Sequence, residues 1–150
     1  MNKEPLHILL ADDDAEDRML FKAAFDEMDI EVEINFHSVN NGVQLMKCLA
    51  IIDQPLPHFL FLDLNMPCKS GLECLIEIRR NIRYKNMPIA IYSTSVSNHD
   101  VDEAFSNGAT IYIKKPNDFN ELIKVLEKAI LTVHTDRILL FNRPDFRAIF

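Results

Sequence analysis

The chain has 150 residues, nearly half of them hydrophobic, and a formal net charge of −7. This length fits one domain with a substantial core, and the hydrophobic content excludes a disordered chain. The negative charge argues against a general nucleic-acid binder, which needs a basic face. No apolar run approaches the roughly 20 residues of a membrane span, and the N-terminus lacks the apolar core of a signal peptide, so we expect a cytoplasmic protein without membrane contact.

The three cysteines, Cys48, Cys68 and Cys74, form an odd set without C-x-x-C spacing. This pattern argues against a disulfide framework or a zinc site, and it agrees with a reducing cytoplasm. We expect Cys48 and Cys74, which fall in helical patterns, to act as small packing residues.

Short apolar runs alternate with amphipathic segments along the whole chain. The runs predict strands, and the segments with helical periodicity predict helices. In chain order we expect a strand over 6–11, a helix over 15–28, a strand over 31–39, a helix over 43–50, a strand over 59–62, a helix over 72–82, a strand over 89–92, a helix over about 97–107, a strand over 110–113 and a helix over 122–133.

This fivefold alternation predicts an α/β fold with a doubly wound parallel sheet and helices on both faces, joined by right-handed crossovers. Residues 59–62 are apolar throughout and lie between Pro57 and Pro67, which is typical of a central strand buried on both faces. Residues 31–39 alternate between apolar and polar, so we place that strand nearer the edge of the sheet.

The central run of residues 59–62 stops at a carboxylate, Asp63. A carboxylate at the end of a buried strand costs free energy unless it is paired or used. Ligands of doubly wound sheets bind outside the carboxyl ends of the strands. Polar groups of complementary kinds follow four of the five predicted strands, which indicates a site at this rim: Asp12, Asp13 and Asp14; Asp63 and Asn65; Ser93, Thr94 and Ser95; Lys114 and Lys115.

The residue types in this set favour phosphoryl transfer. Clustered carboxylates repel one another, and a cation such as Mg²⁺ relieves that repulsion. A hydroxyl group and a lysine opposite the metal can bind the remaining phosphoryl oxygens. The acceptor would be a carboxylate, and Asp63, at the end of the central strand, is the candidate because both other kinds of group flank it.

The chain resembles the receiver domain of bacterial two-component response regulators over about residues 5–133. The resemblance implies a flavodoxin-like fold with a five-stranded parallel sheet in the order 2-1-3-4-5. It rests on four motifs in the right order on the right elements: Leu10-Ala11-Asp12-Asp13-Asp14, Leu62-Asp63-Leu64-Asn65-Met66-Pro67, Ile91-Tyr92-Ser93-Thr94 and Ile113-Lys114-Lys115-Pro116.

This resemblance implies that Asp63 accepts a phosphoryl group from a phosphohistidine of a sensor histidine kinase or a histidine phosphotransfer protein. It also implies an Mg²⁺ ion held by Asp13, Asp63 and the backbone carbonyl of Asn65, with Asp12 acting largely through water. The protein would catalyse only its own phosphorylation and dephosphorylation and turn over no free substrate.

The resemblance assigns switch and phosphoryl-binding roles to three further residues. The Ser93 hydroxyl group and the Lys115 ammonium would bind phosphoryl oxygens, whereas Lys114 would point away. Ser93 and Tyr112 would form the switch that changes the face of the fourth helix, fifth strand and fifth helix. The Lys115–Pro116 peptide bond is expected to be cis.

Thr94 departs from the family pattern, which usually has a smaller residue at this position, and it could narrow access to Asp63 and slow phosphoryl exchange. The set Ser93-Thr94-Ser95 resembles single-domain receivers that accompany bacterial phytochromes.

We divide the chain into a receiver domain, 1–135, and an apolar C-terminal extension, 136–150. The extension is too short for a DNA-binding domain, so output would be by protein–protein contact with an unidentified partner. Pro144 should stop any helix near Asn142. The apolar extension either folds back on its own domain or contacts a partner, and it and the last helix are candidate homodimer surfaces.

Two other functions remain open from the residues alone. An Mg²⁺-dependent phosphohydrolase of the haloacid-dehalogenase family would use Asp63 as nucleophile, but it needs a carboxylate where Asn65 stands. A flavin- or nucleotide-binding module would need glycine or hydroxyl groups after the first strand, where the chain has three acids, and the whole chain has three glycines.

Overall fold

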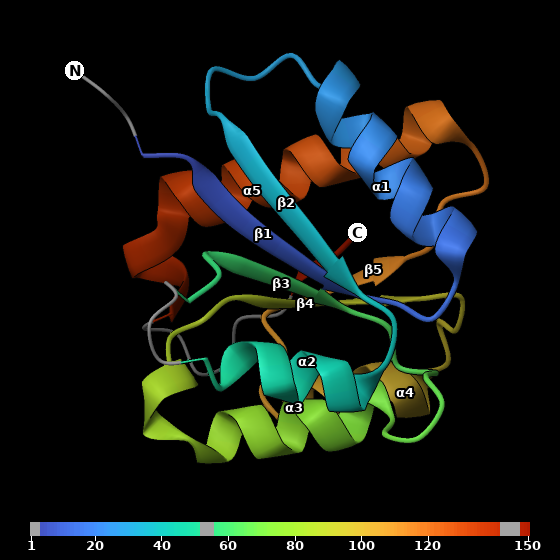
Figure 1. Cartoon of the computed structure of the whole chain (residues 1–150), viewed down its shortest axis with the longest axis vertical. Coiled ribbons are helices and arrows are strands. Elements are labelled where there is room, and N and C mark those ends of the chain that lie inside the picture. The colour runs from blue at the N-terminus through green and yellow to red at the C-terminus, as the bar shows by residue number, and fades with distance from the viewer. Residues whose placement is uncertain (1–3, 52–55, 142–147) are drawn as a thin grey trace.

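The fold is a single parallel sheet between two layers of helices. The computed structural model describes residues 4–51, 56–141 and 148–150. The strand order is β2-β1-β3-β4-β5-β6, and every pair of neighbours is parallel. In Figure 1, α1 and α5 cover one face of the sheet, and α2, α3 and α4 cover the other. The predicted fold class and the order 2-1-3-4-5 are therefore confirmed, with β2 at an edge as expected.

The strands and helices follow the predicted alternation with small shifts at their ends. The strands are β1 Leu6–Ala11, β2 Ile34–Val39, β3 Phe59–Leu62, β4 Ile89–Ser93, β5 Ile111–Lys114 and β6 Ala148–Ile149. The helices are α1 Ala15–Glu27, α2 Gly42–Leu49, α3 Gly71–Arg80, the 3-10 helix η1 Ile82–Tyr84, α4 Asn98–Ser106 and α5 Phe119–Phe141. Helix α5 begins three residues before its apolar pattern because the Asp118 side chain accepts a hydrogen bond from the Glu121 N–H (2.8 Å) and so supports the first turn.

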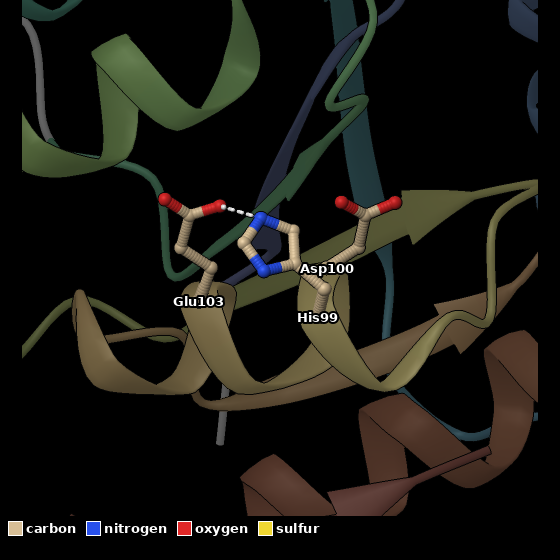
Figure 2. A group of neighbouring side chains, drawn as sticks. All are labelled: His99, Asp100 and Glu103. Atoms are coloured by element: carbon tan, nitrogen blue, oxygen red, sulfur yellow. Dashed lines mark ion pairs between the residues drawn. The ribbon is translucent and has the colours of Figure 1, made fainter.

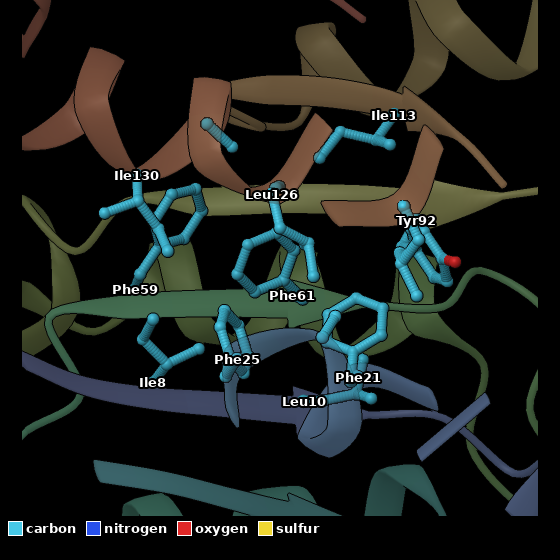
Figure 3. Close-up of a cluster of buried hydrophobic side chains, with 14 of the residues drawn as sticks. Ile8, Leu10, Phe21, Phe25, Phe59, Phe61, Tyr92, Ile113, Leu126 and Ile130 are labelled. Carbon is cyan, nitrogen blue, oxygen red and sulfur yellow. The ribbon is translucent and has the colours of Figure 1, made fainter. Parts of the chain in front are cut away.

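Strand β3 lies at the centre of the sheet, and all four of its side chains are completely buried. Its residues alternate between the two faces, so they join both hydrophobic clusters. Figure 3 shows Phe59 and Phe61 packed among side chains of α1 and α5. The Phe61 ring meets the Phe21 ring edge-on at a centroid distance of 5.3 Å. This packing buries the strand that carries Asp63 between the two helix layers.

The sixth strand adds to the predicted five-stranded sheet. Ile111 and Tyr112 of β5 pair with Ala148 and Ile149 of β6. Phe150 extends the pairing, since its N–H donates to the Tyr112 carbonyl (2.9 Å) and its carbonyl accepts from the Lys114 N–H (3.1 Å). Residues 148–150 thus fold back on their own domain.

Helix α5 runs to Phe141, through the boundary that we drew between residues 135 and 136. Pro144 lies outside the described residues, as do its neighbours in 142–147.

Gly71, the first residue of α3, packs directly against the backbone that presents Asp63. A Cβ atom at this position would lie 2.0 Å from the Asp63 carbonyl oxygen. The preceding Ser70 forms a capping box with Glu73, which holds the start of the helix in this place. The loop between β3 and α3 can therefore close only if residue 71 has no side chain.

We predict that Gly71→Ala lowers the free energy of unfolding by about 1–3 kcal/mol, because the added methyl group must displace backbone at the end of β3. Urea denaturation would measure this change. Asn120→Ala, on the exposed side of α5, is the control and should change the free energy of unfolding by less than about 0.5 kcal/mol. Equal stability of Gly71→Ala and wild type would contradict the close approach.

Candidate functional site

Two buried carboxylates lie side by side where β1 and β3 end. Ala11 and Leu62 are register partners, and the Asp63 N–H donates to the Ala11 carbonyl (2.9 Å), so the next residue of each strand reaches the same rim. Asp12 is fully buried, and Asp63 is 4% exposed. Asp13 is exposed, and it brings a third carboxylate to the cluster. Ligand oxygens of these three residues all lie within 4.8 Å of one another.

Lys115 reaches this cluster from the end of β5. Its Nζ lies 3.3 Å from Asp12 Oδ2 and 3.3 Å from Asp63 Oδ2. It lies closer, 2.8 Å, to the Oδ2 atom of Asp17, a residue of the first turn of α1. The prediction that Lys115 enters the site and Lys114 does not agrees with the structure, since Lys114 is exposed.

The expectation of a cis Lys115–Pro116 bond is wrong, because the described residues contain no cis peptide bond. The trans chain suffices to bring Lys115 to the site. Its N–H donates to the Ser93 carbonyl (2.9 Å), which continues the pairing of β4 and β5, while its side chain extends to Asp63.

Burial dominates the electrostatics of the two strand-end carboxylates. It raises the pKa of Asp12 to about 7 and raises the pKa of Asp63 above its usual range. Burial alone would lower the pKa of Lys115, but its bond to Asp17 and the charges of Asp12 and Asp63 outweigh that effect, so its pKa is raised. The lysine therefore stays charged and favours ionisation of both acids.

One oxygen of this cluster has no hydrogen-bond partner among the described residues. Asp12 Oδ2 is buried, and although the Lys115 ammonium is 3.3 Å away, it makes no hydrogen bond to this atom. An unsatisfied buried carboxylate oxygen beside two further carboxylates is a donor set that suits a hard divalent cation. The residues present thus fit a divalent metal.

Asn65 contributes to the cluster through its backbone. Its N–H donates to Asp63 Oδ1 (3.1 Å), which fixes the orientation of the carboxylate, and its side chain is exposed. The predicted metal contact of its carbonyl oxygen stays a prediction.

Ser93 and Tyr112 are joined through the loop between β4 and α4. Ser93 is fully buried, and its Oγ accepts a hydrogen bond from the Ser95 N–H (3.1 Å). The hydroxyl group of Tyr112 donates to the Ser95 carbonyl (2.7 Å). Tyr112 is itself fully buried, and burial raises its pKa. Thr94, between the two serines, is exposed.

The family model of the response regulator receiver domain matches residues 8–127. The chain belongs to the response regulator receiver family. That match contains all four motifs at the carboxyl ends of β1, β3, β4 and β5.

The relatives of this receiver domain include single-domain regulators. It is 30% identical over 129 residues to the probable methanogenesis regulatory protein FilR2 of Methanothrix harundinacea (strain 6Ac), covering 84% of this chain and 82% of FilR2. It is 28% identical over 127 residues to the response regulator Rcp1 of Synechocystis sp. (strain ATCC 27184 / PCC 6803 / Kazusa), covering 82% of this chain and 85% of Rcp1.

Solved structures agree with these relatives. The phosphorylated cyanobacterial phytochrome response regulator RcpA has a TM-score of 0.77 and 25% identity, over 86% of this chain and 94% of RcpA. The Mn²⁺-bound form of Rcp1 has a TM-score of 0.74 and 27% identity, over 89% of this chain and 97% of Rcp1. The resemblance to phytochrome-associated receivers is thereby confirmed.

Among the described residues of this receiver domain, no helix is long and apolar enough to cross a membrane.

A second group of possible ligands, His99, Asp100 and Glu103, lies on α4 (Figure 2). The His99 side chain is 81% exposed and forms an ion pair with Glu103 one turn on, at 3.2 Å. Asp100 accepts a hydrogen bond from the Ser95 hydroxyl group, which lowers its pKa. Contacts of this kind are typical of a solvent-exposed helix surface. His99, Asp100 and Glu103 therefore differ from the buried cluster of Asp12 and Asp63.

Asp17 is the site residue that sequence reasoning missed. Its position in the first turn of α1 had an ordinary explanation, the favourable interaction of an acid with the helix dipole. The feature of the sequence that could have identified Asp17 as a site residue was its spacing from Asp14. The residue follows Asp14, the N-cap of α1, by three positions, and the start of that helix lies at the same rim as Asp12.

We predict that, without divalent metal, the free energy of unfolding falls as pH rises from about 4 to about 7. The pKa of Asp12 is raised to about 7 by burial, so the folded state binds the proton more tightly than the unfolded state does. Urea denaturation in chelator across this range would measure the slope. Asp12→Asn should reduce the slope to the part that Asp63 contributes, whereas Asp26→Asn, on exposed α1 surface, should leave it unchanged. A divalent cation should raise stability at pH 7 in wild type and less in Asp12→Asn.

We also predict that Tyr112→Phe speeds hydrogen exchange of the backbone amides in residues 94–97, because this change removes the bond from the tyrosine hydroxyl group to the Ser95 carbonyl. Exchange measured by NMR would test this. Tyr84→Phe is a matched control: its buried hydroxyl group donates to the Leu49 carbonyl (2.9 Å), so exchange should change near Leu49 instead. Unchanged exchange at 94–97 in Tyr112→Phe would contradict the role of this bond.

Proposed function

We propose that this receiver domain accepts a phosphoryl group on Asp63 from a phosphohistidine of a sensor histidine kinase or a histidine phosphotransfer protein. The observation that carries the proposal is the buried Asp63 carboxylate beside a charged lysine and two further carboxylates at the end of the central strand. Receiver domains as a family accept phosphoryl groups in this way, and the phosphorylated form of RcpA is among the similar structures.

In the transfer step, an oxygen of the ionised Asp63 carboxylate attacks phosphorus in line with the histidine nitrogen. The new O–P bond forms as the P–N bond breaks, and the histidine departs with the bonding electron pair. The Asn65 N–H holds Asp63 Oδ1 and so limits rotation of the carboxylate. The Lys115 ammonium keeps positive charge next to the acceptor, where negative charge accumulates.

Asp12, Asp13, Asp63 and the Asn65 backbone carbonyl would hold the metal, with Asp12 acting largely through water. We infer Mg²⁺, whose preference for carboxylate, carbonyl and water oxygens matches this set. When bound, the ion would neutralise charge on the phosphoryl oxygens and on the carboxylates themselves.

The switch would run from Ser93 to Tyr112. For its hydroxyl group to bind a phosphoryl oxygen, Ser93 must release the Ser95 N–H, which it holds in this structure. Ser95 also carries the carbonyl that binds Tyr112. Movement of the loop would therefore shift Tyr112 and change the surface formed by α4, β5 and α5. Thr94, exposed directly after Ser93, would narrow access to Asp63 and slow exchange of the phosphoryl group.

Output would be by protein–protein contact in the cytoplasm, through a partner still to be identified. Residues 1–135 would act as the receiver domain and residues 136–150 as an extension, and homodimerisation would use the face of α5 or this extension. The protein would catalyse transfer to and from its own Asp63 only. The hydrolase and flavin hypotheses gain no support, since the chain belongs to the receiver family.

We predict that incubation with acetyl phosphate and Mg²⁺ adds one phosphoryl group to wild type and none to Asp63→Asn, because Asp63 is the acceptor. Intact mass spectrometry would measure the adduct. Chelation of the metal should abolish it as well. Asp26→Asn, which removes the same charge from exposed surface, should take up the group normally.

An adduct on Asp63→Asn would place the acceptor elsewhere. Steady consumption of acetyl phosphate without any adduct on wild type would indicate hydrolysis or a short-lived acyl phosphate. Rapid-quench mass spectrometry at millisecond times would detect a short-lived acyl phosphate on Asp63.

A further inference from the structure

Asp17 makes the shortest of the three contacts between Lys115 and a carboxylate, although it belongs to neither the acceptor nor the metal set. Its Oδ2 lies 2.8 Å from Lys115 Nζ, within the usual range of a charge-assisted hydrogen bond. The two strand-end carboxylates are each 3.3 Å from the same nitrogen. Side-chain exposure is 21% for Asp17 and 16% for Lys115, so their bond lies at the mouth of the site but is largely shielded from water.

Lys115 cannot satisfy its acidic neighbours and a phosphoryl group equally. An ammonium has three N–H donors; this one donates to Asp17 and Asp63 and lies 3.3 Å from Asp12 without a hydrogen bond to it. A phosphoryl group adds a further charge of about −1.5 to −2 and three acceptor oxygens next to Asp63. Lys115 must then turn toward those oxygens, and its bond to Asp17 is the strongest that opposes the turn.

We propose that Asp17 is a positioning residue that holds Lys115 at the mouth of the site and thereby slows phosphorylation of Asp63. The proposal rests on the proposed function of Asp63 and Lys115, and it assigns to Asp17 a role through the lysine alone. Asp17 lies outside the group of carboxylates that could share a metal ion, so binding of a metal would not occupy it.

The test is the rate of phosphorylation by acetyl phosphate at saturating Mg²⁺ and constant pH. Asp17→Asn keeps an acceptor for Lys115 but removes its negative charge, which weakens the bond to the ammonium. We expect this variant to react about three- to tenfold faster than wild type, and Asp17→Glu, which restores the charge, to return toward the wild-type rate. Glu16→Gln, which removes the same charge from an exposed residue of the same helical turn, should change the rate less than about twofold.

A double-mutant cycle distinguishes action through the lysine from action as a bare charge. In a Lys115→Gln background, which lowers the overall rate, Asp17→Asn should no longer accelerate the reaction. Persistence of the acceleration in that background would overturn the proposal, as would equal rates for Asp17→Asn and Glu16→Gln.

A measurement without phosphate separates this proposal from the proposed function. In NMR spectra of ¹⁵N-labelled protein, the Lys115 ammonium should give a slowly exchanging signal in wild type and Glu16→Gln, and a weaker or absent one in Asp17→Asn. Failure of wild type to accept phosphate or beryllofluoride would refute the proposed function only. An equally strong ammonium signal in Asp17→Asn would refute the positioning role.

Discussion

The site depends on the Lys115 ammonium, whose positive charge lowers the free-energy cost of burying the carboxylates of Asp12 and Asp63. Asp12 and Asp63 are taken out of water by the strands that carry them, and burial opposes their ionisation. Lys115 supplies the compensating charge from the end of a third strand, and this charge favours the ionised form of both acids. The same arrangement leaves one carboxylate oxygen unsatisfied, which is why a divalent cation fits the site.

The rigid core around β3 and the adaptable loop after β4 serve different needs. Asp63 follows a fully buried strand and is held by backbone groups on two sides, so it keeps its place. Ser93 also ends a buried strand, but the loop after it is held by individual hydrogen bonds. Ser95 forms one each with Ser93, Tyr112 and Asp100. A few hydrogen bonds of this kind can be exchanged at low cost, whereas a packed strand cannot move.

Periodicity and strand-end chemistry predicted most of the fold and most of the site. The five core strands and the meeting of Asp12, Asp63 and a lysine follow from local patterns together with the rule that parallel strands end at one rim. The choice of Lys115 over Lys114 came from the family resemblance. Asp17 could not be singled out, because an acid in the first turn of a helix has a sufficient local explanation. Strand β6 has two residues, too few for any alternation, and its pairing depends on a distant partner. The peptide bond before Pro116 was expected from resemblance alone, and no local pattern tested it.

The pairing of β6 with β5 has a consequence for the behaviour of the protein at high concentration. A parallel sheet of five strands would expose the backbone N–H and carbonyl groups of β5 along one side, and such an edge can recruit strands of other molecules. Here the added strand covers part of that row with only two residues, beside the ring of Phe150 and the ammonium of Lys128, 4.4 Å apart. On this side of the sheet the outward edge is thereby only two residues long, and so short an edge offers little backbone for intermolecular strand pairing.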